Sequence, residues 1–415
     1  MILAFGGRYP AMREMLPLRE AQKLVLSRVG LMEAEKLPLG EALGRVSAAP
    51  VFARDALPPF DCSAMDGYAL RSEDSAERAE VTLTVQAELP AGQAPREALK
   101  PGCCMVVMTG APIPEGADVV VPREKVRREG PRAVIPGNLE AGTNVIKAGS
   151  DIQRGSQILD RGDVIGVGEV AMLAAQGLGE VKVYQLPTVA VLTTGDELLD
   201  VEEPLAPGKI RNSNGYMIAA AIEEAGGRPL PFPPLPDDLE KTKEALVRAA
   251  EVADLVLSTG GVSVGDYDLV RRALFEIADE VLFWRVRIKP GMPVVAAVRG
   301  KTLYLGLSGK PGGALVDFYL LAAPVIAKMG GRKNHLLPPV KAVLESDFPK
   351  SSPERTRYLW GRAYYNGSWR VLLSGGGELA AMQGYNALVE IPWGSGPLAA
   401  GDIVDILLLK GVVQT

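Results

Sequence analysis

The 415-residue chain carries 45 Lys and Arg residues against 50 Asp and Glu residues, a formal net charge of −5, and 47% of its residues are hydrophobic. At roughly 150 residues per domain, this length predicts about three domains with cores that need no disulfide bonds. The acidic balance provides no basic stripe of the kind that binds nucleic acid. We therefore expect any bound anion to occupy a local site.

Several classes of site are disfavoured by composition. Three cysteines, Cys62, Cys103 and Cys104, are too few for a disulfide framework or a four-cysteine zinc site, and His335 is the only histidine. The N-terminal segment lacks a basic leader followed by an apolar core, and the apolar stretch 314–329 is shorter than the ~20 residues that span a bilayer. We expect a cytoplasmic protein without membrane contact, whose chemistry depends on carboxylates, lysines and backbone amides.

The predicted elements begin with an amphipathic helix in residues 16–35, where apolar residues recur at helical spacing. A region rich in Pro and Gly follows, and its alternating apolar runs predict a small inserted β domain at 53–147. Residues 168–184 then predict a helix ended by Gly177 and a strand, which rejoin the first helix. The mixed N-terminal domain is therefore expected to be discontinuous, with residues 1–52 and 148–184.

From residue 185 strands and helices alternate, which predicts an α/β domain with a parallel sheet at 185–331. Its helical segments are expected at 214–227, 237–254, 269–278 and 312–331. Beyond Pro338 and Pro339 the signals are those of strands, and Asn366 with Gly367 predicts a hairpin turn. Residues 332–415 are therefore expected to form a small β barrel or sandwich.

Three predicted strands of the α/β domain end in loops rich in Gly, Ser or Thr, at 192–198, 254–268 and 306–316. Ligands bind outside the carboxyl ends of strands in open parallel sheets, so these loops should converge on one crevice. Within 254–268, DLVLSTGGVSVGDYD, the glycines let backbone amides approach an anion. Asp266 and Asp268 either cap the following helix or hold a hard cation beside that anion.

Three further motifs precede these loops in the chain: PPFDCSAMDGYAL at 58–70, VMTGAPIPEGADVVV at 107–121 and IKAGSDI at 146–152. Over nearly its whole length the sequence resembles the molybdopterin molybdenumtransferases, the MoeA and gephyrin E-domain family. The resemblance implies that molybdate is inserted into adenylylated molybdopterin with release of AMP, forming molybdenum cofactor, in a Mg²⁺-dependent reaction. It also implies an elongated four-domain homodimer in which the molybdopterin-binding domain faces the partner's inserted domain. Transient contacts with molybdopterin adenylyltransferase and molybdoenzymes are implied as well.

Site residues are carried over from the matching motifs. Carboxylates that extend from a strand end can bind hydrated Mg²⁺, and Arg285 and Lys289 alternate along one predicted strand, so both should face one anion. The expected catalytic residues are Asp61, Asp151, Glu197, Asp268 and Lys289. The expected metal ligands are Asp268, Glu197 and Asp238, with Asp237 as the alternative to Asp238. The expected substrate-binding residues are Ser63, Asp66, Thr109, Gly195, Ser213, Asn214, Thr259, Gly260, Gly261, Ser263, Gly265, Arg285, Ser308, Gly309, Lys310 and Pro311.

Some positions depart from the family pattern. Lys310 stands where the family usually has asparagine, which adds positive charge near the anion. In the last domain, Arg357 or Arg362 replaces an arginine associated with molybdate, and Ser374 replaces a serine. Two alternative functions follow: a pterin-binding or scaffold protein without turnover, and a molybdopterin adenylyltransferase, although the latter is expected as a compact single domain.

Overall fold

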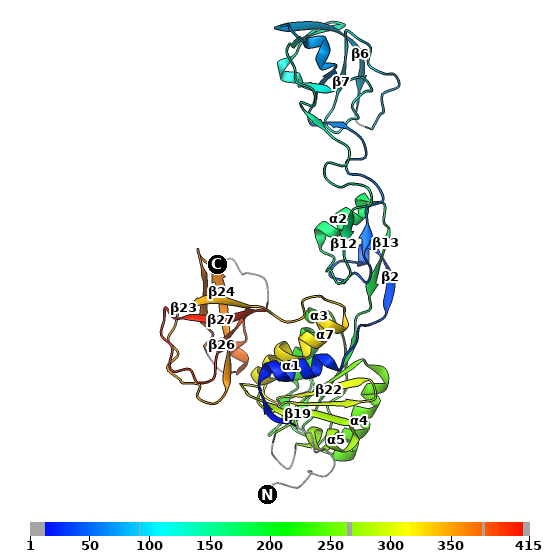
Figure 1. Cartoon of the computed structure of the whole chain (residues 1–415). Helices are drawn as coiled ribbons and strands as arrows, with labels where there is room; N and C mark the ends of the chain where they lie inside the picture. The colour runs from blue at the N-terminus through cyan, green and yellow to red at the C-terminus, as the bar shows by residue number, and fades with distance from the viewer. Residues whose placement is uncertain (1–12, 91, 264–267, 376–377, 410–415) are drawn as a thin grey trace.

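The computed structural model describes residues 13–90, 92–263, 268–375 and 378–409. The chain forms an elongated molecule, with an α/β body at one end and a small β domain at the other, joined by a narrow middle segment (Figure 1). A second β domain lies beside the body. The predicted fold class is confirmed: a multidomain α/β protein with an inserted β domain and a C-terminal β barrel.

The body is built on a sheet with strand order β1-β19-β21-β22-β18-β14-β17. Strands β22, β18, β14 and β17 run parallel, as predicted, whereas β21 is antiparallel to both neighbours, so the sheet is mixed. All of β18 is buried, which explains its uninterrupted apolar run. The bounds are β1 Arg13–Leu16, β14 Thr188–Thr193, β17 Arg228–Pro231, β18 Leu255–Thr259, β19 Glu280–Val286, β21 Val295–Arg299 and β22 Thr302–Leu307.

Helices cover both faces of this sheet. Alternate residues of β14 belong to two cores, Val191 on the side of α1, α3 and α7, and Leu192 on the side of α4 and α5. Among the described residues, one segment, Pro311–Met329, is long and apolar enough to cross a membrane; most of it is buried in the body, so it is a core helix. The bounds are α1 Leu18–Ser27, α3 Ser213–Ala225, α4 Leu239–Val252, α5 Leu269–Ile277, α6 Pro311–Asp317, the π-helical segment Phe318–Ala322 and α7 Ala323–Met329.

The N-terminal helix differs from its prediction in length and in place. It ends at Ser27, and β2, Ala34–Pro38, begins where residues 16–35 were expected to be helical. Strand β1 pairs in parallel with β19, and α1 buries Val25 in the core of the body. Both elements therefore pack with the body, whereas the predicted division placed residues 1–52 in the mixed N-terminal domain. The reason is that the apolar face of α1 completes the core on this side of the sheet.

Residues 34–184, called the arm below, extend away from the body (Figure 1). In the middle segment β2 pairs with β13 and β3 pairs with β12, so β13 joins β2 and not the first helix, to which it was predicted to return. The outer part is the inserted domain, whose sheet order is β8-β5-β7-β6-β10-β9 around Leu70 and Ile135. The bounds are β3 Val51–Phe52, β5 Gly67–Leu70, β6 Glu80–Leu89, β7 Cys103–Val107, β8 Val119–Pro122, β9 Arg127–Glu129, β10 Arg132–Pro136, β12 Gln157–Leu159, α2 Val167–Ala175 and β13 Glu180–Tyr184.

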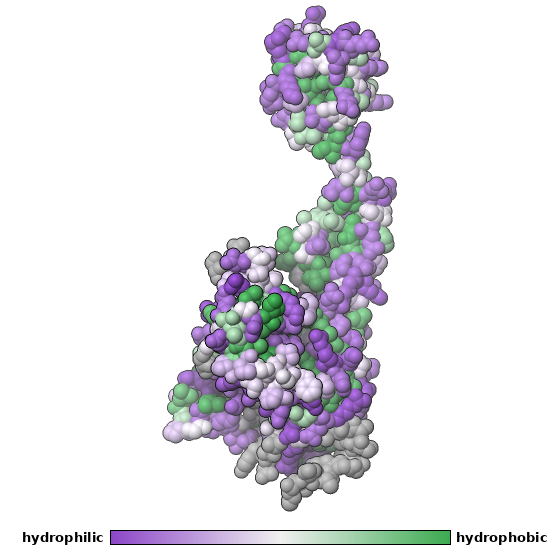
Figure 2. Space-filling model, turned by 60° about the vertical axis from the view of Figure 1, so that its left-hand side comes forward, coloured by the Kyte–Doolittle hydropathy of each residue, from purple (hydrophilic) through white to green (hydrophobic). Residues whose placement is uncertain are grey.

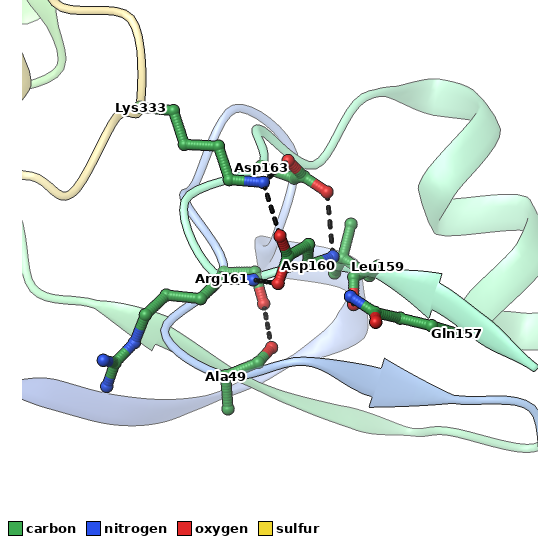
Figure 3. Close-up of polar contacts among 8 residues, drawn as sticks. Ala49, Gln157, Leu159, Asp160, Arg161, Asp163 and Lys333 are labelled. Atoms are coloured by element: carbon green, nitrogen blue, oxygen red, sulfur yellow. Dashed lines mark hydrogen bonds and ion pairs between the residues drawn. The ribbon is translucent and has the colours of Figure 1, made fainter.

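A lysine of the body holds the inner end of the arm. Lys333, in the loop after α7, places its Nζ 2.7 Å from Asp160 Oδ2 and 2.9 Å from Asp163 Oδ1 (Figure 3). The pKa of each carboxyl group is lowered, chiefly by the hydrogen bond from Lys333. The Lys333 backbone N–H also donates to the Gly162 carbonyl at 3.4 Å. These contacts attach the arm to the body at a third place, in addition to the two segments near residues 34 and 184 where the chain passes between them.

The C-terminal strands close into a barrel because β24 pairs with both β25 and β26. The predicted turn at Asn366 and Gly367 joins β24 to β25, and Gly367 has a φ of 71°. Strand β20, Ile288–Lys289, leaves the body and pairs with β24. The bounds are β23 Pro339–Leu344, β24 Thr356–Tyr365, β25 Trp369–Leu373, α8 Glu378–Ala381, β26 Ala387–Ile391 and β27 Ile403–Leu408.

Candidate active site

A pocket of about 390 Å³ lies where β14, β18 and β22 end. This edge of an open α/β sheet is where ligands usually bind. Residues singled out from the sequence that line it are Gly195, Glu197, Ser213, Asn214, Asp237, Thr259, Gly260, Gly261, Gly309 and Pro311. Those not singled out are Thr194, Leu198, Ile210, Arg211 and Asn212. The available signal for Ile210, Arg211 and Asn212 was their position directly before Ser213.

The glycines of the pocket let its loops approach closely. Gly195, Gly260 and Gly261 have φ values of 144°, 92° and 65°, a region that other residues rarely adopt. A Cβ at Gly260 would lie 3.0 Å from Thr194 Oγ1, and one at Gly261 would lie 3.1 Å from Val270 N. The backbone itself therefore forms this part of the pocket wall.

Two asparagines at the start of α3 hold the loops together. Asn212 caps the helix by accepting a hydrogen bond from Gly215 N–H at 3.0 Å. Asn214 Nδ2 donates to the Gly309 carbonyl at 2.7 Å, which joins the helix start to the loop after β22. Because N–H groups at a helix start favour negative charge, this end of the pocket suits a phosphate.

Acidic side chains occupy the other part of the pocket. Glu197 and Asp237 line it, and burial raises the pKa of Asp237, with further contributions from the nearby carboxylates of Asp196 and Glu197. Asp238, the residue expected to bind metal, instead caps α4 by accepting from Lys241 N–H at 3.1 Å. The structure thus favours Asp237 over Asp238 in the pocket.

These carboxylates are compatible with Mg²⁺. Within the described ranges, no cluster of three or more His, Cys, Asp or Glu side chains has the geometry of a metal site. Mg²⁺, however, often binds through one or two carboxylates together with substrate phosphates and water. The like-charged pair of Glu197 and Asp237 provides such oxygen donors, and a cation between them would relieve their repulsion.

The end of the glycine loop is only partly described. Gly265 and Asp266 lie in 264–267, outside the described residues. Neither Ser263 nor Asp268 lines the pocket. Asp268 stands at the N-cap position of α5, and its charge counteracts the lowering of the Arg271 pKa by burial.

The two cations expected on one strand face lie in different sheets. Arg285 is the penultimate residue of β19 and has a φ of 69°. Its guanidinium carbon lies 4.0 Å from the centroid of the Trp284 ring, and its Nη1 lies 2.8 Å from Glu14 Oε1. Lys289 lies in β20, which pairs with the barrel. The shared-face prediction is therefore wrong, because the unusual backbone at Arg285 breaks the alternation and the chain passes from one sheet to the other.

Lys289 belongs to a cluster of cations beside the barrel, called the cationic cluster below. Its pKa is lowered chiefly by Arg357 and also by Arg355 and Lys350. Arg357 is paired with Lys289 in register between β20 and β24, and its Nε is buried without a hydrogen-bond partner among the described residues. Like charges held this close favour an anion between them. Sequence reasoning missed Arg355 and Lys350, whose only signal was their nearness to Arg357.

The remaining C-terminal candidates lie elsewhere on the barrel. Arg362 donates to the Gln383 carbonyl at 3.2 Å, so Arg357 is the arginine that joins Lys289. Ser374 Oγ is buried and makes no hydrogen bond with the described residues. Lys310, between two pocket residues, lies 3.6 Å from Glu378 of α8, which brings a second barrel element to the pocket.

Ser308 and Lys289 connect the pocket to the cationic cluster. Ser308 is buried at the end of β22, directly before Gly309 of the pocket. Gly313 packs between the two segments, since a Cβ there would lie 3.0 Å from Ser308 Cβ and 3.4 Å from Gly291 N. The cationic cluster is therefore adjacent to the loop that lines the pocket.

The candidates on the arm are not brought to the pocket within one chain. Asp61 accepts hydrogen bonds from Lys147 Nζ at 2.7 Å and Ala148 N–H at 2.8 Å. Asp66 accepts from both the N–H and the Oγ1 of Thr109 at 2.8 Å. Ser63 is buried and Asp151 is exposed. Figure 1 shows the inserted domain at the opposite end of the molecule from the sheet of the body.

Comparison with known proteins places this arrangement in a family. Residues 16–177 match the MoeA N-terminal region (domain I and II), and residues 190–328 match a probable molybdopterin binding domain. Proteins called molybdopterin molybdenumtransferase are 35% identical in Nostoc sp. over 95% of this chain and 93% of that protein, and 35% identical in Staphylococcus aureus over 96% of each. The chain belongs to the MoeA family.

Solved MoeA structures agree with this assignment. The crystal structure of a molybdopterin biosynthesis moeA protein from Pyrococcus horikoshii OT3 is 35% identical, covers 95% of this chain and 100% of its own, and superposes with a TM-score of 0.81. The crystal structure of a molybdopterin biosynthesis moea protein from Pyrococcus horikosii is 30% identical, covers 96% of this chain and 100% of its own, and superposes with a TM-score of 0.82. The MoeA fold thus extends over the body, the arm and the barrel together.

Proposed function

We propose that the chain is a molybdopterin molybdenumtransferase that inserts molybdate into adenylylated molybdopterin and releases AMP. The observation that carries this proposal is the pairing of two adjacent sites in a MoeA-family chain. One is a pocket of backbone amides, hydroxyls and carboxylates, and the other is the cationic cluster around Lys289. Together they suit a substrate with an anionic linkage and an incoming oxyanion.

The pocket is proposed to hold the phosphate linkage of the substrate. Gly260 and Gly261 line the pocket, and Ser213 and Asn214 lie at the start of α3. The N–H groups at this helix start favour a phosphate over a neutral group. Thr259, Gly195, Gly309 and Pro311 would line the same path, with Ser263 beyond the pocket on the same loop. Lys310 would leave its exposed partner Glu378 to meet the substrate.

The cationic cluster is proposed to bind molybdate, the second substrate. Lys289, Arg355 and Arg357 form an environment that an oxyanion would stabilise, and arginine offers two parallel donors to two oxygens. The Arg357 Nε is a buried donor without a hydrogen-bond partner among the described residues. The Ser308 loop connects this cluster to the pocket, which would place molybdate beside the substrate sulfurs.

Mg²⁺ is proposed to bind at Glu197 and Asp237 together with substrate oxygens. When bound, it would neutralise charge on the phosphate linkage as AMP leaves. Glu197 and Asp237 would orient that linkage, and Asp268 would contribute its charge from the start of α5. Lys289 and Arg285 would add positive charge on the other side.

A homodimer is proposed to complete the site. Asp61, Asp66, Thr109 and Asp151 lie on or beside the inserted domain, far from the pocket of the same chain (Figure 1). Hydrophobic surface continues along the middle of the arm (Figure 2), where Phe52, Val164 and Val167 are 52%, 43% and 78% exposed. Exposed apolar patches often mark protein interfaces.

The activity is tested by incubating purified protein with adenylylated molybdopterin, molybdate and Mg²⁺ and by measuring AMP. We expect AMP release that depends on molybdate. Binding of the substrate without any AMP release would instead favour the pterin-binding or scaffold alternative. Incorporation of AMP from ATP into molybdopterin would favour the adenylyltransferase alternative.

A further inference from the structure

Asp317 is a buried carboxyl group that the proposed reaction does not use. It ends α6 where the helix continues with a π-helical segment, and none of its surface is exposed. Wide helical turns of this kind occur frequently at functional sites. Asp317 Oδ2 accepts a hydrogen bond from Ser308 N–H at 2.9 Å, and Oδ1 has no hydrogen-bond partner among the described residues. One oxygen therefore holds the loop that follows β22.

The other oxygen packs against the segment that carries Lys289. A Cβ at Gly291 would overlap Asp317 Oδ1, and Gly291 has a φ of 96°, so glycine is required there for two reasons. The two segments also touch each other through Gly313, as described above. Asp317 thus contacts the Ser308 loop through Oδ2 and packs against the loop of Lys289 through Oδ1.

The charge state of Asp317 suits this position. Burial raises its pKa well above the ordinary value, while the hydrogen bonds from Ser308 act in the opposite direction. The raised pKa favours the neutral form of the carboxyl group, which would place no negative charge behind the two segments that are proposed to bind anions. The group can therefore be buried without a cation as partner.

We propose that Asp317 is a positioning residue, which fixes the cationic cluster against the pocket through Ser308 and Gly291. The proposal rests on the function proposed above, because that function assigns the two segments to molybdate and to the adenylylated substrate. A misplacement of about 1 Å between reacting groups can cost as much as ~100-fold in rate. The separation of the two sites is the quantity that Asp317 would control.

Two substitutions separate positioning from charge. Asp317→Asn keeps the shape and an oxygen that accepts from Ser308 N–H, whereas Asp317→Leu keeps the approximate volume and leaves that N–H buried without a partner. AMP release is measured over a range of molybdate concentrations. We expect Asp317→Leu to raise the half-saturating molybdate concentration by roughly tenfold or more, and Asp317→Asn to remain within about threefold of wild type. If Asn is as damaging as Leu, the ionised carboxylate acts itself and the proposal is wrong.

A second measurement does not depend on turnover. Amide hydrogen exchange is followed on peptides that cover residues 285–315 in wild type, Asp317→Asn and Asp317→Leu. We expect faster exchange in this region only for Leu, because the Ser308 amide loses its buried acceptor. Unchanged exchange in Leu would overturn the proposal, whereas absence of AMP release by wild type would refute the proposed function alone.

Gly291→Ala tests the same contact from the other side. Its Cβ would push against Asp317, so we expect the same increase in half-saturating molybdate and in exchange near Ser308. This variant decides the matter if Asp317→Leu does not fold, as judged by thermal unfolding. A Gly291→Ala protein with wild-type molybdate dependence and wild-type exchange would contradict the inference.

Discussion

The acidic side chains of the arm and those of the pocket are held in opposite ways. On the arm, Asp61 accepts hydrogen bonds from Lys147 and Ala148 and Asp66 accepts them from Thr109, and these bonds lower the pKa of each carboxyl group. In the pocket, Asp237 is desolvated and lies near Asp196 and Glu197, and its pKa is raised. The arm carboxylates stabilise their loops as anions. The pocket carboxylates repel one another, which favours a cation or a ligand between them.

The largest effect is expected from removing a pocket carboxylate. Glu197→Ala should reduce AMP release by roughly 1000-fold, because it removes a ligand for the cation that neutralises the leaving phosphate. The thermal unfolding temperature should not fall, since the substitution also relieves repulsion with Asp237. Glu244→Ala, at an exposed position of α4, is the matched control and should behave as wild type. Retention of most of the activity in Glu197→Ala would show that this carboxylate has no role in turnover.

The next largest effect tests whether the arm of one subunit contributes residues to the pocket of its partner. If the arm of one subunit completes the pocket of the other, Asp61→Ala and Glu197→Ala each inactivate, yet a mixed dimer contains one intact site. Random mixing of the two proteins should then restore roughly a quarter of wild-type activity, because half of the dimers are mixed and each has one active site of two. Size-exclusion chromatography checks that subunits exchange. No recovery in exchanging dimers would mean that arm and pocket act within the same chain.

A smaller effect separates two neighbouring acids. Asp237→Ala should raise the Mg²⁺ concentration for half-maximal AMP release by about tenfold, since Asp237 lines the pocket. Asp238→Ala should instead lower the free energy of unfolding by about 1 kcal/mol, since it removes the N-cap of α4. Mg²⁺ titration and chemical denaturation of both variants check this. The reverse pattern would return the metal role to Asp238.

The sequence was sufficient to predict the convergence of the three strand-end loops. Their position follows from local patterns, in which a buried apolar strand is followed by glycines and hydroxyls, and parallel strands must end at one edge of the sheet. The C-terminal barrel could also be predicted, because Asn366 and Gly367 indicate its hairpin turn and apolar residues alternate around that turn. Both predictions rest on the local periodicity of the sequence.

Other features depend on partners distant in sequence, which local patterns do not reveal. β1 belongs to the body because it pairs with β19, about 270 residues later. Arg285 and Lys289 alternate in sequence, but the positive φ at Arg285 and the pairing of β20 with the barrel separate them. Asp237 and Asp238 are both good capping residues, so only the structure shows which of them caps α4.

The smallest effect is expected at the contact between arm and body. Lys333→Met removes the ammonium group that joins Asp160 and Asp163 (Figure 3). Because exposed ion pairs contribute little to stability, the unfolding temperature should change only slightly. The arm should instead sample a wider range of angles, which small-angle X-ray scattering would detect as a broader distance distribution. Lys182→Met, at an exposed arm lysine that forms no ion pair with the described residues, is the matched control.

The pH dependence of this contact has a definite sign. The pKa values of Asp160 and Asp163 are lowered, so their contribution is present above the ordinary value of 3.8 and is lost as the pH falls through the lower folded values. The pKa of Lys333 is raised, so its contribution is complete below 10.5 and is lost as the pH rises through the folded value. The wild-type and Lys333→Met distributions should therefore differ near neutral pH and converge below the lowered pKa values of Asp160 and Asp163 and above the raised pKa of Lys333. A difference that persists at both extremes would show that the lysine acts through packing against Gly162 and not through its charge.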